Sequence, residues 1–306
     1  MRLCRFGDGR LGVVEGSMVR DVTAALDVLP ACRYPLPNYD LLIANLDKVV
    51  ERARAIAPYA AVLPLDNLKL LSPVANPGKI VAAPVNYKKH AQEVRDNPAL
   101  HNNNPALLQS INTIGLFLKA TSSLAGAGEG IHLRKPERRN DHEVELAFVI
   151  GQTGNNIPKS EALEYIAGYS IGLDITIRGT EDRSFRKSPD SYSVLGPWLV
   201  TADEIPNPGE LDLSIAVNGE VRQKSNTNNM ILGVVELIEF ASSFYTLHPG
   251  DIFMTGTPEG VSQIAPGDTI VATIEKIGSM RVGVHAGEQA AVVGEAILSV
   301  AKQERS

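Results

Sequence analysis

Asp141-His142-Glu143-Val144-Glu145-Leu146-Ala147-Phe148-Val149-Ile150 is apolar enough for a buried strand, yet it carries two glutamates two residues apart. Side chains alternate between the faces of a strand, so Glu143 and Glu145 share one face, and the other face has His142, Val144, Leu146, Phe148 and Ile150. Two carboxylates on a half-buried face repel each other and lose hydration, and a divalent cation would relieve both costs. The alternative is an exposed edge with two solvated glutamates, because glutamate is rarely buried unpaired.

A second alternating stretch runs from Tyr169 to Arg178, and Asp174 is its only carboxylate. Together with Glu143 and Glu145, Asp174 would form an all-oxygen site. Hard oxygen ligands favour Mg²⁺ or Mn²⁺, with Ca²⁺ as a further candidate, and no cluster of the scattered cysteines and histidines predicts zinc. The alternative is an ion pair between Asp174 and Arg178 on the same strand face.

Composition excludes several classes of protein. The 306 residues allow one large domain or a large and a small one. A formal net charge of −6 argues against nucleic acid as the main partner. No apolar run approaches the ~20 residues of a membrane span, so no membrane association is expected. The first residues lack a signal-peptide pattern, and Cys4 and Cys32 are too few for a disulfide framework, which predicts a cytoplasmic protein.

Turn signals divide the chain into a small leading unit and a longer body. Residues 1–70 predict a small N-terminal α+β domain, with a hairpin over Leu3–Val14 and a helix near Leu41–Ala57. Prolines then mark a connecting segment, and residues 78–302 predict the catalytic domain. Its short strands predict a mixed α+β fold that is predominantly β. The predicted strands are Lys79–Ala83, Leu116–Ala120, Val144–Ile150, Ala167–Ile177, Trp198–Thr201, Leu211–Val217, Asp251–Met254 and Thr269–Ile274.

Few segments of the body have helical spacing. Ser160–Tyr165 and Ile231–Phe244 are the clearest of them. The stretch from Val94 to Thr113 is polar and rich in Asn and Pro, and it predicts an unstructured loop. Such long loops usually have a function, so we expect this one beside a site; the alternative is a plain surface excursion.

A histidine and a glutamate three residues apart are candidates for a general base and the group that orients it. If the segment around His90 and Glu93 is helical, both side chains lie on one face and can form a hydrogen bond. A glutamate that orients a histidine is a common general-base arrangement, although solvated pairs of this kind are also frequent.

Two lysines and one turn are candidates for holding an anionic group. Lys119 lies in an apolar strand and Lys187 follows Asp174 by 13 residues in the chain. A lysine that snorkels from a strand end is the simpler interpretation of Lys119. The turn Thr255–Gly260 offers N–H groups and hydroxyls to a carboxylate, although most such turns are only turns.

Two other motifs do not fit their usual context. Gly168-x-Ser170-x-Gly172 matches the nucleophile elbow of serine hydrolases, but a strand pattern continues where a helix must follow. The glycine-rich segment 126–130 also leads into a strand pattern, which argues against a dinucleotide site.

Taken together, these stretches resemble the fumarylacetoacetate hydrolase family, in particular its small acylpyruvate-hydrolase-like branch. The resemblance runs from about Gly78 to about Val284, and residues 1–70 resemble the N-terminal domain that some members carry. The motifs occur in the family's order: Asn86-Tyr87-x-x-His90-x-x-Glu93, Leu116–Lys119, His142–Leu146, Gly168–Asp174, Lys187–Ser191, Leu195–Trp198, Val217–Gln223 and Thr255–Gly260.

The resemblance implies a mixed β-sandwich roll, usually a homodimer, that acts on small anionic 2-oxo acids from aromatic catabolism. It implies Mg²⁺ or Mn²⁺ held by Glu143, Glu145 and Asp174, and a His90–Glu93 dyad on a lid segment. Lys187 is then catalytic. The implied substrate-binding residues are Tyr87, Lys119, Arg178, Glu181, Gln223 and Thr257.

The expected reaction is metal-dependent hydrolysis of a C–C bond in a 2,4-dioxo acid such as fumarylpyruvate, with His90 activating water. The same site would also suit a 2-oxo diacid decarboxylase or a 2-hydroxyhepta-2,4-diene-1,7-dioate isomerase. A non-catalytic metal-binding protein is a further alternative.

The chain departs from the family where many members read Ala-Arg-Asp-x-Gln after the aspartate. This chain reads Ile177-Arg178-Gly179-Thr180-Glu181. Glu181 either faces the site and selects the substrate, or pairs with Arg183 or Arg186. We expect pairing, because a carboxylate beside an anionic substrate is repelled.

Overall fold

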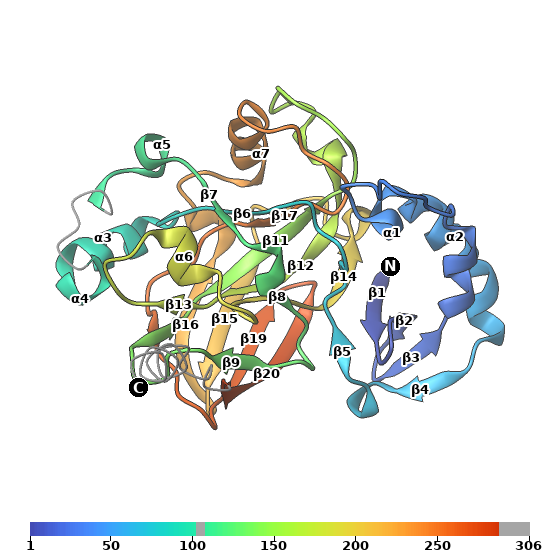
Figure 1. The fold of residues 1–306 in the computed structure, drawn as a ribbon, viewed down its shortest axis with the longest axis horizontal. Coiled ribbons are helices and arrows are strands. Elements are labelled where there is room, and N and C mark those ends of the chain that lie inside the picture. Colours follow the sequence, from blue (N-terminus) through green and yellow to red (C-terminus); the bar gives the residue numbers. More distant parts are fainter. Residues whose placement is uncertain (102–107, 288–306) are drawn as a thin grey trace, which may run out of the picture.

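The structure is a computed structural model that describes residues 1–101 and 108–287. Over these ranges the chain forms three sheets with short helices along their edges (Figure 1). The prediction of a mixed α+β fold that is predominantly β is confirmed. The parts of the predicted loop and catalytic domain at 102–107 and 288–302 lie outside the described residues.

The largest sheet has twelve strands within the described residues. Its central strands are buried on both faces, which explains their nearly continuous apolar sequences. In spatial order the strands are β4 (Val62–Pro64), β3 (Met18–Asp21), β2 (Arg10–Glu15), β1 (Arg2–Phe6), β14 (Ser193–Thr201), β12 (Ile166–Asp174), β11 (Val144–Ile150), β17 (Ile252–Met254), β6 (Ile80–Ala82) and β7 (Phe117–Lys119), with β5 (Leu70–Leu71) beside β1 and β8 (Leu124–Ala125) beside β14.

A five-stranded sheet packs against the large one and closes a sandwich. The shared core contains Leu146 and Phe148 of β11 together with Leu213 and Ile215 of the second sheet. A three-stranded sheet lies at the end of β11. The five strands are β16 (Glu220–Asn226), β15 (Asp212–Val217), β19 (Thr269–Ile274), β20 (Gly278–Ala286) and β9 (Ile131–Leu133), and the three are β13 (Thr176–Ile177), β10 (Asn140–His142) and β18 (Ser262–Gln263).

The alternation of β11 divides its side chains as the sequence predicts. Val144, Leu146, Phe148 and Ile150 point into the sandwich core, whereas Ala147 and Val149 belong to a second core on the opposite face. The predicted strand Val144–Ile150 is confirmed as β11, whereas the residues just before it form β10, which ends at His142 and pairs within the small sheet. Glu143 lies at this junction.

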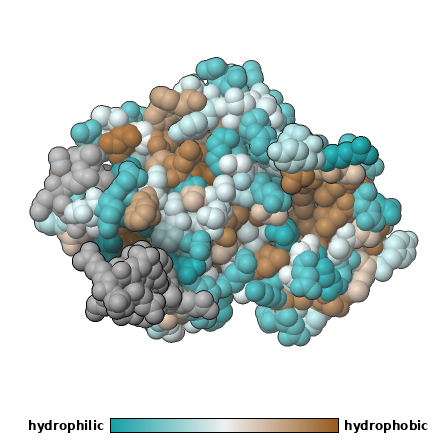
Figure 2. Space-filling model, in the orientation of Figure 1, coloured by the Kyte–Doolittle hydropathy of each residue, from teal (hydrophilic) through white to brown (hydrophobic). Residues whose placement is uncertain are grey.

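The N-terminal residues extend the large sheet. Leu3 of β1 pairs with Leu199 of β14, so the strands of residues 1–70 continue a sheet of the catalytic body. The predicted hairpin is confirmed as β1 and β2, and the predicted helix as α1 (Leu41–Ala44) and α2 (Leu46–Ile56). These helices cover a small core of their own. Figure 2 shows hydrophobic residues gathered over this unit, at the right of the view, and a further hydrophobic patch over the upper middle of the molecule.

The remaining helices are short. The predicted helix at Ile231–Phe244 is confirmed over a shorter range, and Ser160–Tyr165 contains a 3-10 helix instead of an α-helix. Among the described residues no helix has both the length and the apolar character to cross a membrane. The α-helices are α3 (Lys88–Asp96), α4 (Pro98–His101), α5 (Ile111–Ile114), α6 (Arg183–Lys187) and α7 (Val234–Ser242), and the 3-10 helices are Thr23–Val28, Ala57–Tyr59, Leu65–Asn67, Thr121–Ser123, Ala162–Tyr165, Ala202–Glu204 and Thr227–Asn229.

The prediction of an unstructured loop over Val94–Thr113 is wrong for its described part. The end of α3, together with α4 and α5, occupies that stretch, and Val94 and Leu100 pack in a small apolar cluster with Val261. Within the described part of this stretch, Asn97 ends α3 and Pro98 begins α4, so these two residues mark helix boundaries.

Candidate active site

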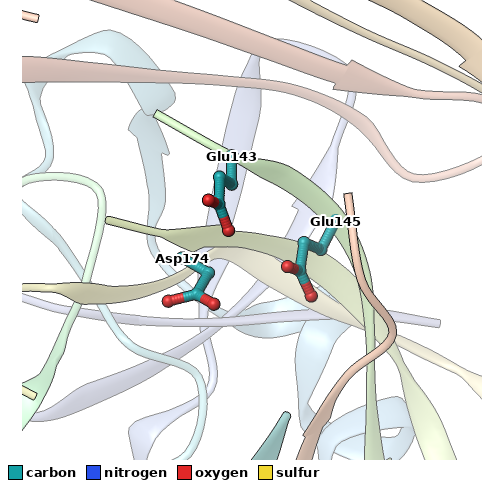
Figure 3. Close-up of side chains that lie close together, drawn as sticks. All are labelled: Glu143, Glu145 and Asp174. Carbon is teal, nitrogen blue, oxygen red and sulfur yellow. The ribbon is translucent and has the colours of Figure 1, made fainter. Parts of the chain in front are cut away.

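Three buried carboxylates meet at the ends of β11 and β12 (Figure 3). Glu143, Glu145 and Asp174 each place a carboxylate oxygen within 4.8 Å of the others, and they are 4%, 2% and 1% exposed. The strands are antiparallel neighbours, and the backbone N–H of Asp174 donates to the carbonyl of Glu143 at 3.0 Å. Strand alternation and this pairing therefore bring together the cluster that the sequence predicted.

Two buried lysines contact the carboxylates. Lys187 Nζ lies 2.5 Å from Glu143 Oε2 and 2.6 Å from Asp174 Oδ2. Lys119 Nζ lies 2.5 Å from Asp174 Oδ1 and also donates to the carbonyl of Tyr192. Lys119 thus does not snorkel to solvent, which corrects the simpler interpretation of its sequence, and it lies behind Asp174.

Arg178 pairs with Asp141 and Glu143 rather than with Asp174. Its Nε donates to Asp141 Oδ2 at 2.7 Å and its Nη2 to Glu143 Oε1 at 3.1 Å. The alternative of a simple Asp174–Arg178 pair is wrong, because β12 ends at Asp174 and Arg178 follows the separate strand β13, which pairs with β10.

The cluster's two glutamates have opposite electrostatic environments. Burial alone would raise the pKa of Glu143, but the charges of Lys187 and Arg178 outweigh burial and hold it below its ordinary value. Burial, and then the negative charge of Asp174, raise the pKa of Glu145 well above its ordinary value. Glu145 accepts a hydrogen bond at 2.7 Å from the backbone N–H of Gly256.

These groups fit a divalent cation. Among the described residues, the buried hydroxyl of Tyr87 has no hydrogen-bond partner, and the charge of Glu145 contributes, after burial, to its raised pKa. A cation held by the three carboxylates would relieve the repulsion between Glu145 and Asp174. Carboxylate oxygens have spare lone pairs, so the lysine contacts do not exclude metal binding.

The His90–Glu93 pair forms on the first turns of α3, as predicted. His90 Nδ1 lies 2.7 Å from Glu93 Oε2, and Glu93 Oε1 accepts from the backbone N–H of Gly260 at 3.0 Å. Gly260 has a φ of +94°, and a Cβ there would lie 2.2 Å from the carbonyl of Arg222, so this contact requires glycine. Because a carboxylate only accepts hydrogen bonds, Nδ1 donates to Glu93, and the lone pair of the neutral imidazole is then on Nε2.

The start of α3 is held in place by Asn86. Its amide nitrogen donates to the carbonyls of Leu232 and Thr255, each at 2.8 Å, and its oxygen accepts from the N–H of Leu232. The two segments that Asn86 joins lie far from it in sequence. The position of His90 therefore depends on the packed fold as well as on the local helix.

Gln223 supports the turn that carries Thr257. Its nitrogen donates to Thr257 Oγ1 and to the carbonyl of Pro258, and its oxygen accepts from the N–H of Val144. Thr257 in turn donates to the carbonyl of Val144 at 2.9 Å. Gln223 is 1% exposed and these contacts occupy its amide, so it positions the turn and lies behind the cavity.

A cavity connects the carboxylate cluster with the dyad. Six predicted residues line it: His90, Glu143, Glu145, Arg178, Lys187 and Thr257. Val94 and Leu100 also line it, so the segment after the dyad does lie beside the site, although it is helical. Arg183 and Arg186 were not predicted, because nothing in their local sequence indicates where a five-residue helix will pack.

Glu181 lies outside the lining of this cavity. Its two oxygens accept from Nη1 and Nη2 of Arg138 at 2.7 and 2.9 Å, and these hydrogen bonds lower the pKa of Glu181 to about 2. The expectation that its side chain pairs with Arg183 or Arg186 is wrong; Arg186 instead donates to the backbone carbonyl of Glu181. The partner lies 43 residues away in sequence, in a loop that only the fold brings near.

Replacing Glu181 by glutamine should therefore act through loop order. We expect a small, several-fold rise in KM that is similar for every substrate, because an exposed ion pair contributes little. Arg138→Gln removes the same pair from the other side and should have the same effect. Measuring kcat/KM for two acylpyruvates decides: a tenfold change in their ratio in Glu181→Gln would instead indicate direct contact with the substrate.

Comparison with known proteins gives consistent matches over the catalytic body. Residues 79–285 match the family model described as fumarylacetoacetate (FAA) hydrolase C-terminal. A maleylpyruvate hydrolase from Aquipseudomonas alcaligenes is 59% identical over 285 residues, covering 93% of this chain and 99% of that protein. A mitochondrial oxaloacetate tautomerase from Rattus norvegicus is 35% identical over 241 residues, covering 74% of this chain and 72% of that protein.

Solved structures extend the likeness to the N-terminal unit. A maleylpyruvate hydrolase from Sphingobium sp. SYK-6, in complex with manganese(II) and pyruvate, is 38% identical with a TM-score of 0.79. A 2-hydroxyhepta-2,4-diene-1,7-dioate isomerase from Mycobacterium marinum is 28% identical with a TM-score of 0.67. Both matches cover 94% of this chain and 100% of the solved chain.

Proposed function

We propose a function from the premise that this chain belongs to the fumarylacetoacetate hydrolase family. It is a hydrolase that cleaves a C–C bond in an acylpyruvate of the maleylpyruvate or fumarylpyruvate type, in aromatic catabolism. The observation that carries this proposal is that Glu143 and Glu145 of the carboxylate cluster line one cavity with His90, which Glu93 orients. The 59% identity to a maleylpyruvate hydrolase supports the same substrate class.

In this proposal His90 acts as the general base. Glu93 holds Nδ1, which leaves the Nε2 lone pair to take a proton from water. The resulting hydroxide adds to the distal acyl carbonyl, and the bond between that carbon and its neighbour breaks. The acyl part leaves as a carboxylic acid, and the neighbouring carbon takes a proton to give pyruvate.

Glu143, Glu145 and Asp174 would hold Mg²⁺ or Mn²⁺, which would supply Lewis-acid stabilisation for negative charge on the 2-oxo group of the substrate. Lys187 remains beside Glu143 and Asp174 and adds a positive charge at the same end of the cavity. Thr257 lines the cavity through a turn that Gln223 supports.

The test is to incubate the Mn²⁺- or Mg²⁺-supplied protein with maleylpyruvate, fumarylpyruvate, oxaloacetate and 2-hydroxyhepta-2,4-dienedioate. Formation of pyruvate together with maleate or fumarate, in equal amounts, is the expected result. Pyruvate from oxaloacetate alone would instead indicate a decarboxylase. No turnover of any of these acids would favour a non-catalytic metal-binding protein.

An isomerase is the second candidate, because the relatives include an oxaloacetate tautomerase and the structural matches a 2-hydroxyhepta-2,4-diene-1,7-dioate isomerase. It would use His90 only to move a proton between the enol oxygen and a carbon atom of the substrate. Hydrolysis incorporates one oxygen from solvent into the acid product, whereas isomerisation incorporates none. Reaction in H₂¹⁸O followed by mass spectrometry of the product separates the two.

A cytoplasmic homodimer, as the family resemblance implies, belongs to the same proposal. Light scattering coupled to size-exclusion chromatography tests the subunit number directly.

A further inference from the structure

Arg183 is a cation in the active-site cavity that forms no ion pair with a carboxylate of residues 1–101 or 108–287. It is the first residue of α6 and lines the cavity together with the carboxylate cluster. Its guanidinium lies 5.3 Å from the centre of the Phe117 ring. Among the described residues, no oxygen accepts a hydrogen bond from Arg183.

The neighbouring cations, unlike Arg183, donate hydrogen bonds to protein oxygens. Arg178 donates to Asp141 and Glu143, and Lys187 contacts Glu143 and Asp174. Arg186 donates to the backbone carbonyls of Ile177 and Glu181. These side chains hold the site together, whereas the five donors of Arg183 remain for a ligand.

Arg183 also lies at a defined place relative to the cluster. Residues 183 and 187 are four apart on α6, so their side chains share a face and lie one helical turn from each other. Both cations lie over the same ring, because Lys187 Nζ is 5.6 Å from the centre of Phe117. Lys187 touches the carboxylates, and Arg183 is therefore displaced from them by about one turn along the cavity.

Leaving this guanidinium without an anion is unfavourable. Burial, and then the positive charge of Arg186, lower the pKa of Arg183, which shows that its surroundings oppose its charge. Arg183 is partly buried, and a cation in such surroundings is stabilised when an anion pairs with it. Arginine forms two parallel hydrogen bonds with a carboxylate, and a flat aromatic ring beneath it limits its rotation.

The loop before α6 fixes this orientation. Glu181 is held by Arg138, and Asp182 caps α6 by accepting from the backbone N–H of Ser184 at 2.8 Å. Both contacts lie outside the cavity lining, so they place Arg183 without using its donors. This is the stretch in which the sequence departs from the common family pattern.

We propose that Arg183 binds the distal carboxylate of the substrate and so selects dicarboxylic acylpyruvates over monocarboxylic ones such as acetylpyruvate. This inference rests on the proposed function, whose 2-oxo acid end lies at the carboxylate cluster. The far carboxylate of the same molecule then pairs with the guanidinium one turn away.

The kinetic test compares kcat/KM for fumarylpyruvate and acetylpyruvate in the wild type, Arg183→Met and Arg183→Lys. The ratio of the two values is expected to fall at least tenfold in Arg183→Met, equivalent to about 1.4 kcal/mol. Arg183→Lys keeps the charge and should retain part of the preference. A merely structural role would lower both values together, and a ratio within threefold of wild type would overturn the proposal.

Arg134→Met is the matched control. Arg134 is a surface arginine that pairs with Asp190 and does not line the cavity, so its loss should leave the ratio unchanged. Mn²⁺-induced stabilisation of Arg183→Met, measured by thermal unfolding, confirms that this variant is folded and retains the metal site.

A binding test is independent of turnover. Calorimetry on the Mn²⁺-loaded protein compares 2-oxoadipate with 2-oxohexanoate, which ends in a methyl group instead of a carboxylate. Wild type should bind 2-oxoadipate at least tenfold more tightly, and Arg183→Met should lose this preference. If no acylpyruvate is hydrolysed but the preference and its loss are observed, the proposed reaction is wrong and the role of Arg183 stands. If acylpyruvates are hydrolysed but the wild type does not prefer 2-oxoadipate, the proposed reaction stands and the role of Arg183 is wrong.

Discussion

Replacing His90 by alanine is expected to lower kcat for acylpyruvate hydrolysis by about 10²–10⁴-fold, the range that a positioned general base supplies. The reason is geometric: Glu93 holds Nδ1 at 2.7 Å, and the imidazole lines the cavity beside the carboxylate cluster. Affinity for Mn²⁺ should hardly change, because His90 is not one of the clustered carboxylates. Pyruvate release and Mn²⁺ titration measure the two quantities separately.

His132→Ala is the control for this change, since His132 is an exposed histidine on β9 and does not line the cavity. It should keep wild-type turnover. Normal turnover by His90→Ala would place water activation elsewhere. If that variant decarboxylates oxaloacetate but cannot hydrolyse acylpyruvates, the dyad serves the hydrolytic step alone.

Removal of the metal is expected to abolish activity, and Glu145→Gln should have nearly the same effect. Chelation with EDTA should inactivate the wild type, and Mg²⁺ or Mn²⁺ should restore it. Mutating a residue that only hydrogen-bonds to a metal ligand typically weakens metal affinity by about 10–100-fold. Replacing a ligand itself, as in Glu145→Gln, should therefore lower the affinity for Mn²⁺ at least tenfold. Wild type should gain about 2.7 kcal/mol of stability at Mn²⁺ a hundredfold above its Kd, and the variant at most about half of that at the same Mn²⁺ concentration.

The metal-free variant should be at least as stable as the metal-free wild type. Burial and then Asp174 disfavour the charge on Glu145, and glutamine removes that charge while keeping an acceptor for the N–H of Gly256. Thermal unfolding with and without Mn²⁺ measures both effects. Glu164→Gln is the control: Glu164 is exposed and does not line the cavity, so this variant should be stabilised by Mn²⁺ as much as the wild type. Full activity of EDTA-stripped wild type would contradict the metal role.

Several features of the site were predictable because they depend on local periodicity. Strand alternation placed Glu143 and Glu145 on one face, and helical spacing placed His90 beside Glu93. The same periodicity was less informative about boundaries. It did not indicate the break between β10 and β11 at Glu143, or the strand β14 beginning at Ser193.

Ion pairs between distant segments were not predictable in the same way. The partners of Arg178 and Glu181 are Asp141 and Arg138, which lie 37 and 43 residues away. Nearer charged residues were the natural candidates from sequence. The actual partners depend on β13 pairing with β10, which brings the two loops together.

By itself the sequence determined the β-rich fold, the three clustered carboxylates and the dyad, because alternation and helical spacing act within a few residues. Only the tertiary structure decided which cations pair with those carboxylates and which cation remains available to bind a substrate. Lys119 and Lys187 reach Asp174 from separate elements, and α6 places Arg183 over Phe117. Charge balance in a buried site depends on distances between segments far apart in the chain, and these distances are set when the sheets pack together.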